Sequence, residues 1–159
     1  MKVAYLHGLE SNGIGPKNDF LKKTFSKVYD PISDYRDTEN VWDTIYNDIL
    51  KFRPDYIIGS SMGGWFAYNI GKKLGVPTLL FNPALHTRSI NPNVDTSGSK
   101  YPKHTLVLGS FDKVIDPVKT ERLVKDSLTK ININREPIGH RTPVNIFIEY
   151  VLKIKKGEI

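Results

Sequence analysis

The sequence contains no cysteine in its 159 residues. That absence excludes a disulfide framework, a thiolate metal site and a cysteine nucleophile. No apolar run approaches the roughly 20 residues that a membrane-spanning helix needs. The first residues pass directly into a strand-like pattern, which leaves no room for a signal peptide. The default expectation is therefore a cytoplasmic protein with no membrane partner.

The sequence also lacks any set of His, Asp and Glu with metal-ligand spacing, so we expect neither a metal nor another cofactor. The glycine-rich segment 8–15 resembles a phosphate loop in composition. A P-loop, however, needs Gly-Lys followed by Ser or Thr where this chain has Gly13-Ile14-Gly15. The dinucleotide pattern G-x-G-x-x-G is not matched either.

The formal net charge is +6, which alone would suit a nucleic acid or an anionic membrane. The Lys and Arg residues are nevertheless spread along the chain, mostly over helix-like segments. No stretch interleaves basic with aromatic residues, as a surface that binds single strands does. The pattern predicts solvated helix faces, and we expect no nucleic-acid partner. A basic binding protein is an alternative supported only by the net charge.

Short apolar runs alternate along the chain with longer segments of helical period. Runs without period-two alternation are typical of strands buried on both faces of a parallel sheet, with helical crossovers between them. The length suits a single domain over residues 1–159. We therefore predict an α/β fold. The expected buried strands are Val3–Leu6, Tyr56–Ile58, Thr78–Phe81 and Thr105–Leu108, with an edge strand at 131–134.

The sequence predicts where two helices begin or end. An apolar stripe over residues 41–50, including Leu50, predicts a helix with Asp37 or Thr38 as its N-cap. The segment after Ser61 predicts a second helix that ends at Gly75.

Two further helices are predicted by a capping residue followed by proline at the first helical position. These pairs are Asp116-Pro117 and Thr142-Pro143. The helix after Pro117 is expected to turn three residues inward, namely Leu123, Val124 and Leu128. The stretch 83–103 is rich in Asn, Pro, Ser and Gly and is interpreted as a surface loop.

The segment Gly59-Ser60-Ser61-Met62-Gly63 matches G-x-S-x-G between a strand and a helical pattern. That spacing suits a sharp turn with a strained central serine, because glycine on either side leaves room for neighbouring backbone. The following helix N-terminus would favour negative charge at the turn. Taken alone, the same residues also fit a glycine-rich turn or a phosphate nest.

Residues downstream supply partners for such a serine. A serine hydroxyl needs a general base, which a third group must orient. In this motif the chain order is serine, acid, histidine. Asp112 follows the strand at 105–108, and His140 follows the strand at 131–134, so both lie past the C-terminal ends of strands, where open α/β sheets place their sites. We predict a triad of Ser61, Asp112 and His140.

Other residues compete for these roles. Asp116 is the alternative acid, although its place before a proline suits a helix cap. His86 also follows a strand end and is the alternative base, whereas His104 is expected to begin a strand. Ser60 precedes the centre of the turn and is expected to serve packing or hydrogen bonding.

Acyl transfer builds negative charge on a carbonyl oxygen, and preorganised backbone N–H groups stabilise that charge. The residue after the nucleophile is Met62, and the loop after the first strand contributes Leu9, so we expect the oxyanion donors there. Gly8 and Glu10 are candidate substrate contacts, although a solvated loop carboxylate also explains Glu10.

Several of these segments together resemble the small YqiA-type esterases of the α/β-hydrolase superfamily. The matching segments are Tyr5-Leu6-His7-Gly8-Leu9, residues 59–65, Phe81-Asn82-Pro83-Ala84, residues 109–116 and Gly139-His140. The resemblance implies a three-layer α/β-hydrolase fold with helices on both faces of a mostly parallel sheet. It also implies esterase or thioesterase activity, with Ser61, Asp112 and His140 at the matching catalytic positions.

Two departures from the family concern the substrate. The segment after Asn82-Pro83 is shorter than the family leads us to expect, and Leu9 stands where phenylalanine is common. We therefore expect a reduced fold without a large lid domain, acting on a small-molecule ester or thioester with a small or exposed acyl group. A non-catalytic binding module that retains the fold is the alternative, and an intact triad argues against it.

Overall fold

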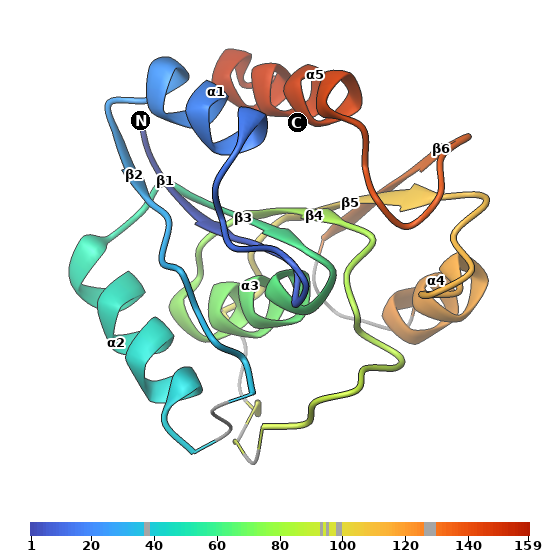
Figure 1. Cartoon of the computed structure of the whole chain (residues 1–159), viewed down its shortest axis with the longest axis horizontal. Coiled ribbons are helices and arrows are strands. Elements are labelled where there is room, and N and C mark those ends of the chain that lie inside the picture. The colour runs from blue at the N-terminus through green and yellow to red at the C-terminus, as the bar shows by residue number, and fades with distance from the viewer. Residues whose placement is uncertain (37–38, 93, 95, 98–99, 126–129) are drawn as a thin grey trace.

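The computed structural model describes residues 1–36, 39–92, 94, 96–97, 100–125 and 130–159. Within these ranges six strands form one sheet, in the order β2-β1-β3-β4-β5-β6, and every neighbouring pair is parallel (Figure 1). The strands are β1 (Lys2–Leu6), β2 (Lys27–Tyr29), β3 (Tyr56–Ser60), β4 (Thr78–Phe81), β5 (His104–Gly109) and β6 (Ile131–Glu136). The helices are α1 (Pro16–Thr24), α2 (Val41–Phe52), α3 (Ser61–Leu74), α4 (Pro117–Lys125) and α5 (Val144–Lys156).

The elements form three layers. Helices α1 and α5 cover one face of the sheet, and α2, α3 and α4 cover the other (Figure 1). Alternate residues of β1 divide between the two cores: Val3 and Tyr5 pack with α1 and α5, whereas Ala4 and Leu6 pack with α2 and α3. A continuous apolar run is what such a strand needs, because both of its faces are buried. The predicted three-layer α/β architecture is confirmed.

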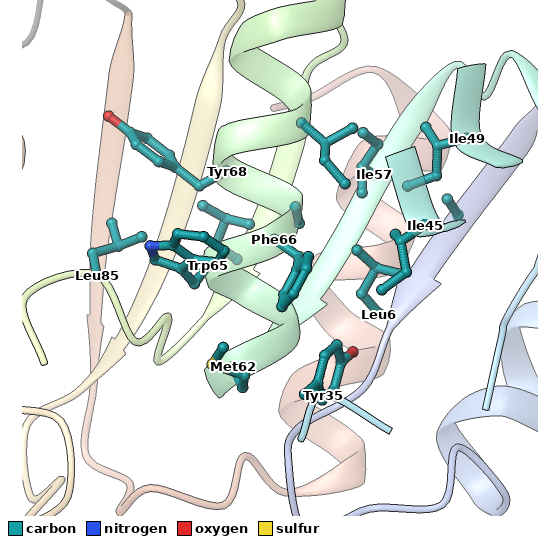
Figure 2. Packing of buried hydrophobic residues seen from close by; sticks show 14 of the residues in the cluster. Leu6, Tyr35, Ile45, Ile49, Ile57, Met62, Trp65, Phe66, Tyr68 and Leu85 are labelled. Atoms are coloured by element: carbon teal, nitrogen blue, oxygen red, sulfur yellow. The ribbon is translucent and has the colours of Figure 1, made fainter. Parts of the chain in front are cut away.

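Helix α3 is the most deeply buried helix, and aromatic rings surround its first half (Figure 2). Phe66 lies 5.1 Å from Trp65, 5.8 Å from Trp42 and 5.0 Å from Tyr35, measured between ring centroids. Large rings in contact bury much apolar surface and leave little freedom to shift. The start of α3 is therefore held rigidly against the sheet.

Two elements, α1 and β2, lie between residues 8 and 40, where the sequence pattern predicts neither a helix nor a strand. Helix α1 buries only Asn18 and Leu21 fully, so its apolar stripe is too narrow to recognise. Strand β2 has three residues, none fully buried, and pairs at the sheet edge. Both elements depend on contacts with distant parts of the chain more than on a pattern of their own.

The predicted helix ends were partly wrong. Asp116 does cap α4, since its Oδ1 accepts hydrogen bonds from the N–H groups of Val118 (2.8 Å) and Lys119 (3.3 Å). Thr142 does not cap α5. Pro143 itself is the N-cap, because its ψ of 152° keeps it in extended backbone and delays the helix to Val144.

The predicted inward stripes also need correction. Leu123 is 50% exposed, because α4 turns Thr120 and Val124 inward and Leu123 lies to one side of that stripe. Leu50 is exposed because it lies to one side of the buried stripe of α2. Asp37, Thr38 and Leu128 lie outside the described residues, and Asn40 is the N-cap of α2.

The described residues between β4 and β5 form neither helix nor strand, and they build no large lid over the sheet. This segment is not simply a surface loop as predicted, because Ala84 and Leu85 are buried against the start of α3. Arg88 continues the contact with its guanidinium 4.7 Å from the ring centre of Trp65. None of the helices in the described ranges combines the length and apolar character that crossing a membrane requires.

His104 makes the stability of the fold sensitive to acid. The residue is fully buried at the start of β5, with Nδ1 2.8 Å from Thr78 Oγ1. Burial, with a smaller contribution from the charge of Lys72, lowers the pKa of His104 from 6.5 to about 4. The unfolded chain therefore takes up this proton at a higher pH than the folded chain does, so the stabilisation is complete above the unfolded value and is lost as the pH falls toward the folded one.

We expect the free energy of unfolding to fall between pH 6.5 and 4 by up to about 3 kcal/mol from this group. Urea unfolding at a series of pH values measures the loss. The variant His104→Gln, which has no group titrating there, should lose less stability over the same range. Equal losses in the two proteins would mean that other groups cause the acid sensitivity.

Candidate active site

The chain turns sharply from β3 into α3 at Ser61. Strand β3 ends at Ser60, and Ser61 begins the helix with a φ of 50°. A positive φ is unusual for a residue with a side chain and stores strain, which rigid surroundings must hold in place. The strained serine that the motif predicts is present, and it lies at the C-terminal edge of the sheet.

The glycines of the motif mark where α3 approaches the sheet most closely. A Cβ on Gly59 would stand 2.7 Å from the carbonyl oxygen of Gly63, and a Cβ on Gly63 would run into the carbonyl oxygens of Leu6 and His7. The spacing of the motif therefore follows from the contact of the first turn of α3 with the ends of β1 and β3.

Ser61, His140 and Asp112 form a continuous hydrogen-bonded chain. The Nε2 atom of His140 lies 3.0 Å from Ser61 Oγ, and Nδ1 lies 2.8 Å from Asp112 Oδ2. The other carboxylate oxygen, Oδ1, accepts the N–H groups of Val114 (2.8 Å) and Ile115 (2.9 Å). A carboxylate only accepts, so Nδ1 of the neutral imidazole carries the proton and Nε2 is left to accept from the serine.

Within this chain of three residues, Asp112 is more deeply buried than His140. The side chain of Asp112 has no exposed surface, whereas that of His140 is 23% exposed. A buried carboxylate needs hydrogen-bond donors to offset its desolvation, and the two backbone N–H groups and the imidazole supply three. Solvent and small molecules can therefore reach the imidazole, while the acid is shielded.

The competing residues lie elsewhere. Asp116 is occupied as the cap of α4, where hydrogen bonds from the N–H groups of Lys119 and Val118 lower its pKa. His104 starts β5, at the end of the strand opposite to Asp112. His86 lines a hollow beside Asp112, whereas it is the imidazole of His140 that lies within hydrogen-bond distance of Ser61 Oγ. Ser60 is the last residue of β3.

The loop after β1 is held in place by a buried histidine that the sequence analysis did not assign a role. His7 lies with Nδ1 2.7 Å from Gly8 O, and its Nε2 accepts the N–H of Ser33 at 3.2 Å. The hydroxyl of Tyr35 donates to the carbonyl of His7 at 2.8 Å. Burial raises the pKa of Tyr35, so this hydroxyl keeps its proton. The His-Gly pair was visible in the sequence, but its partners come from a segment without a recognisable pattern.

The predicted oxyanion and substrate residues belong to the loop after β1 and to the first turn of α3. Gly8 is adjacent, since a Cβ built on it would lie 3.5 Å from the Cβ of Ser61. Leu9 is half-buried against the α2 and α3 side of the core, and Met62 is buried in the first turn of α3, where helix N–H groups have no acceptor within the helix. Glu10 is exposed, and its carboxylate pairs with the guanidinium of Arg36 at 2.9 Å.

A hollow of about 800 Å³ lies beside Asp112. Its walls are residues 86–87, the loop after β5 and the first turn of α4. Val114 and Val118 give it exposed apolar surface, and its charged lining residues are of both signs, Lys113 and Lys119 with Asp112 and Asp116. In the described part of the chain, no three His, Asp or Glu residues come together in a way that would hold a metal ion.

A family model described as "Uncharacterised protein family (UPF0227)" matches residues 2–125. No curated protein matches the chain.

Solved structures match over nearly the whole chain. Mouse alpha/beta hydrolase domain-containing protein 10 is 12% identical with a TM-score of 0.70, over 99% of this chain and 90% of that one. A monoacylglycerol lipase from Paleococcus ferrophilus is 12% identical with a TM-score of 0.67, over 96% and 93%. The Bacillus cereus carboxylesterase is 14% identical with a TM-score of 0.64, over 97% and 87%. At such identities the likeness establishes the α/β-hydrolase fold.

Substituting Gly63 tests the contact beneath the serine. We expect Gly63→Ala to lower the free energy of unfolding by at least the roughly 1–3 kcal/mol typical of overpacking, because backbone must move to admit the methyl group. Gly139→Ala is the control, since the nearest atom to its Cβ lies 3.9 Å away, and it should change stability by less than about 0.5 kcal/mol. Chemical denaturation measures both. Native stability in Gly63→Ala would show that the approach of α3 to β1 does not require glycine.

Proposed function

The chain belongs to the uncharacterised protein family UPF0227, the YqiA family, and we propose that it is a serine hydrolase that cleaves carboxylic esters or thioesters. The observation that carries the proposal is the unbroken hydrogen-bonded chain from Ser61 through His140 to Asp112. The names of structural neighbours, which include a carboxylesterase and a monoacylglycerol lipase, support ester hydrolysis.

Acylation begins when Ser61 Oγ attacks the carbonyl carbon of the substrate. As the new C–O bond forms, Nε2 of His140 takes the hydroxyl proton, and Asp112 stabilises the resulting imidazolium through Nδ1. The tetrahedral intermediate collapses by breaking its bond to the leaving group. The alcohol or thiol departs with the proton that His140 returns.

The carbonyl oxygen gains negative charge in this step, and backbone N–H groups of Met62 and Leu9 are the proposed donors to it. The position of Met62 supports its part, because the first turn of α3 directs N–H groups and the positive end of the helix dipole at the site. The hydrogen bonds of His7 hold the loop after β1, which contains Leu9. Loss of one oxyanion donor typically lowers turnover by about 10²–10³-fold.

Water then resolves the acyl-enzyme. His140, again neutral, removes a proton from the water, whose oxygen attacks the acyl carbon. Collapse of the second intermediate breaks the bond to Ser61 Oγ, which regains its proton from His140, and the carboxylic acid leaves. The partly exposed imidazole gives water access to this step.

We propose a small-molecule substrate with a small or exposed acyl group. The described residues form no large lid over the site, and on this basis we expect a long acyl chain to stay in water instead of burying its apolar surface. The hollow beside Asp112 offers room for one part of the substrate, with Val114 and Val118 as its apolar contacts. Gly8, beside Ser61, is a further proposed contact.

A fluorophosphonate probe tests the proposal directly. We expect intact mass to rise by one probe adduct in the native protein and not in Ser61→Ala. Ser60→Ala is the matched control and should react like the native protein, because it removes the neighbouring hydroxyl only. His140→Ala should react about 10³-fold more slowly or worse, since the base is lost, whereas His86→Ala keeps the base and should react far faster than His140→Ala. An unlabelled native protein would refute the hydrolase and favour a binding module.

The hollow is tested by filling it. Val118→Trp should reduce kcat/KM for p-nitrophenyl esters with bulky acyl groups by about tenfold, because the added ring takes space that the substrate needs, and should affect p-nitrophenyl acetate much less. Leu123→Trp is the matched control, as Leu123 is equally exposed on the same helix but does not line the hollow. Equal behaviour of the two variants toward every ester would exclude the hollow from substrate binding.

A further inference from the structure

Asn82 combines features that call for an explanation. It follows β4 directly, is 98% buried and has a φ of 43°. Asparagine tolerates this left-handed backbone better than most side chains, yet the conformation still costs free energy. A buried amide is also costly unless its polar atoms are paired. Both costs are explicable if the side chain has a specific task.

The Asn82 amide is fully hydrogen-bonded. Its Oδ1 accepts the N–H of Gly109 at 2.7 Å, and its Nδ2 donates to the carbonyls of Gly139 (3.1 Å) and His140 (2.8 Å). A backbone N–H can only donate and a carbonyl can only accept, so these partners determine the orientation of the amide. The site needs one acceptor and two donors on a short side chain. Aspartate has the same shape but no donor when ionised.

The three partners of Asn82 belong to the loops that carry the acid and the base. Gly109 ends β5 three residues before Asp112, and its carbonyl accepts the N–H of Asp112 at 3.2 Å. Gly139 and His140 form the loop that presents the imidazole.

The chain after Asn82 meets the third member of the site. The N–H of Ala84 donates to the carbonyl of Ser61 at 3.0 Å, and Ser60 pairs with Phe81 across β3 and β4. The segment 81–84 therefore contacts the turn at Ser61 on one side and the loops of Asp112 and His140 on the other. Residues separated by about 20 to 80 positions in the sequence meet at this one point.

We propose that Asn82 is a positioning residue of the hydrolase. Its side chain holds the backbone of His140 and the start of the loop of Asp112 in place relative to Ser61. This inference rests on the proposed function. Ser110 and Phe111 already bond to the carbonyls of Glu136 and Ile138, so the two loops are joined without Asn82. Asn82 adds the link from both of them to the strand that touches the nucleophile.

The effect of losing this link follows from geometry. Asn82 Nδ2 holds the carbonyl of His140 at 2.8 Å, and the imidazole of the same residue must reach Ser61 Oγ. If the backbone of His140 becomes more mobile, the position of its Nε2 becomes less certain too. A misplacement of about 1 Å in reacting groups can cost about 10²-fold in rate. The loss should fall on reaction at Ser61, because Asn82 does not line the hollow.

The test compares two Asn82 variants with a matched control. Asn82→Gly removes the side chain and suits the positive φ, so it should fold. Asn82→Asp keeps the shape and removes the donors. Asn69→Asp is the control, since Asn69 is also a buried amide that donates to a carbonyl, that of Trp65 at 2.9 Å, away from the triad loops. For each protein the fluorophosphonate labelling rate is measured from about pH 5 to 9, together with the thermal unfolding temperature.

The expected results separate positioning from general stability. Both Asn82 variants should label about 10- to 10²-fold more slowly while folded. In Asn82→Asp the acidic limb of the pH profile should also move to higher pH, because an added carboxylate near His140 favours the protonated imidazole. Asn69→Asp measures the effect of burying a carboxylate elsewhere in the fold. It should lower the unfolding temperature but leave the labelling rate and the acidic limb of its pH profile unchanged.

Other outcomes overturn the inference in distinguishable ways. If the native protein labels and folded Asn82→Gly labels at the native rate, Asn82 is not a positioning residue and the proposed function stands. If the native protein does not label at all, the proposed function fails and this inference fails with it. Should Asn82→Asp not fold, Asn82→Gly alone decides the question.

Discussion

The close approach of the first turn of α3 to the ends of β1 and β3 is the constraint on which the site depends. Backbone carbonyls of Leu6 and His7 occupy the space where a side chain at position 63 would lie, and Ser61 takes its left-handed conformation to let the chain make the turn. A strained conformation persists only where rigid packing leaves no alternative. Here the aromatic rings around Trp65 and Phe66 supply that packing.

The same approach brings two loops to the serine from either side. The loop after β1 reaches it because β1 and β3 are neighbours, and the segment after β4 reaches it because β3 and β4 are neighbours. Parallel strands end at one edge of the sheet, so their following loops meet there. The acid and histidine loops lie one and two strands further out, at β5 and β6. Side chains and backbone bonds must bridge that distance to bring His140 to Ser61.

Hydrogen bonds between side chains and backbone groups hold these loops in place, and those of Asn82 span the distance. Asp112 is aimed by two N–H groups of its own loop, His7 by Ser33, and Asn82 by three groups on two loops. Each of these side chains is buried, so an unmade bond would cost the full desolvation of a polar group. The loops consequently have one strongly preferred arrangement. Preorganisation of this kind holds the side chains of the site in one geometry before a substrate binds.

The sequence by itself determined the class of fold and the outline of the site. Continuous apolar runs predicted the central strands, because strands buried on both faces must be apolar throughout, and the G-x-S-x-G spacing predicted the strained turn at Ser61. Chain order singled out His140 ahead of His86, and the place of Asp116 before a proline, which suits a helix cap, favoured Asp112 as the acid. The structure brings Asp112 and His140 to Ser61. Their catalytic roles remain a prediction.

Only the tertiary structure decided the rest. Helix α1 and strand β2 have too little apolar pattern to be recognised, and Pro143 displaced the expected cap at Thr142. Asn82 bonds to residues 27, 57 and 58 positions away, and Tyr35 to one 28 positions away. No local pattern records such partners, because a hydrogen bond between distant segments depends on where the whole sheet places their backbones.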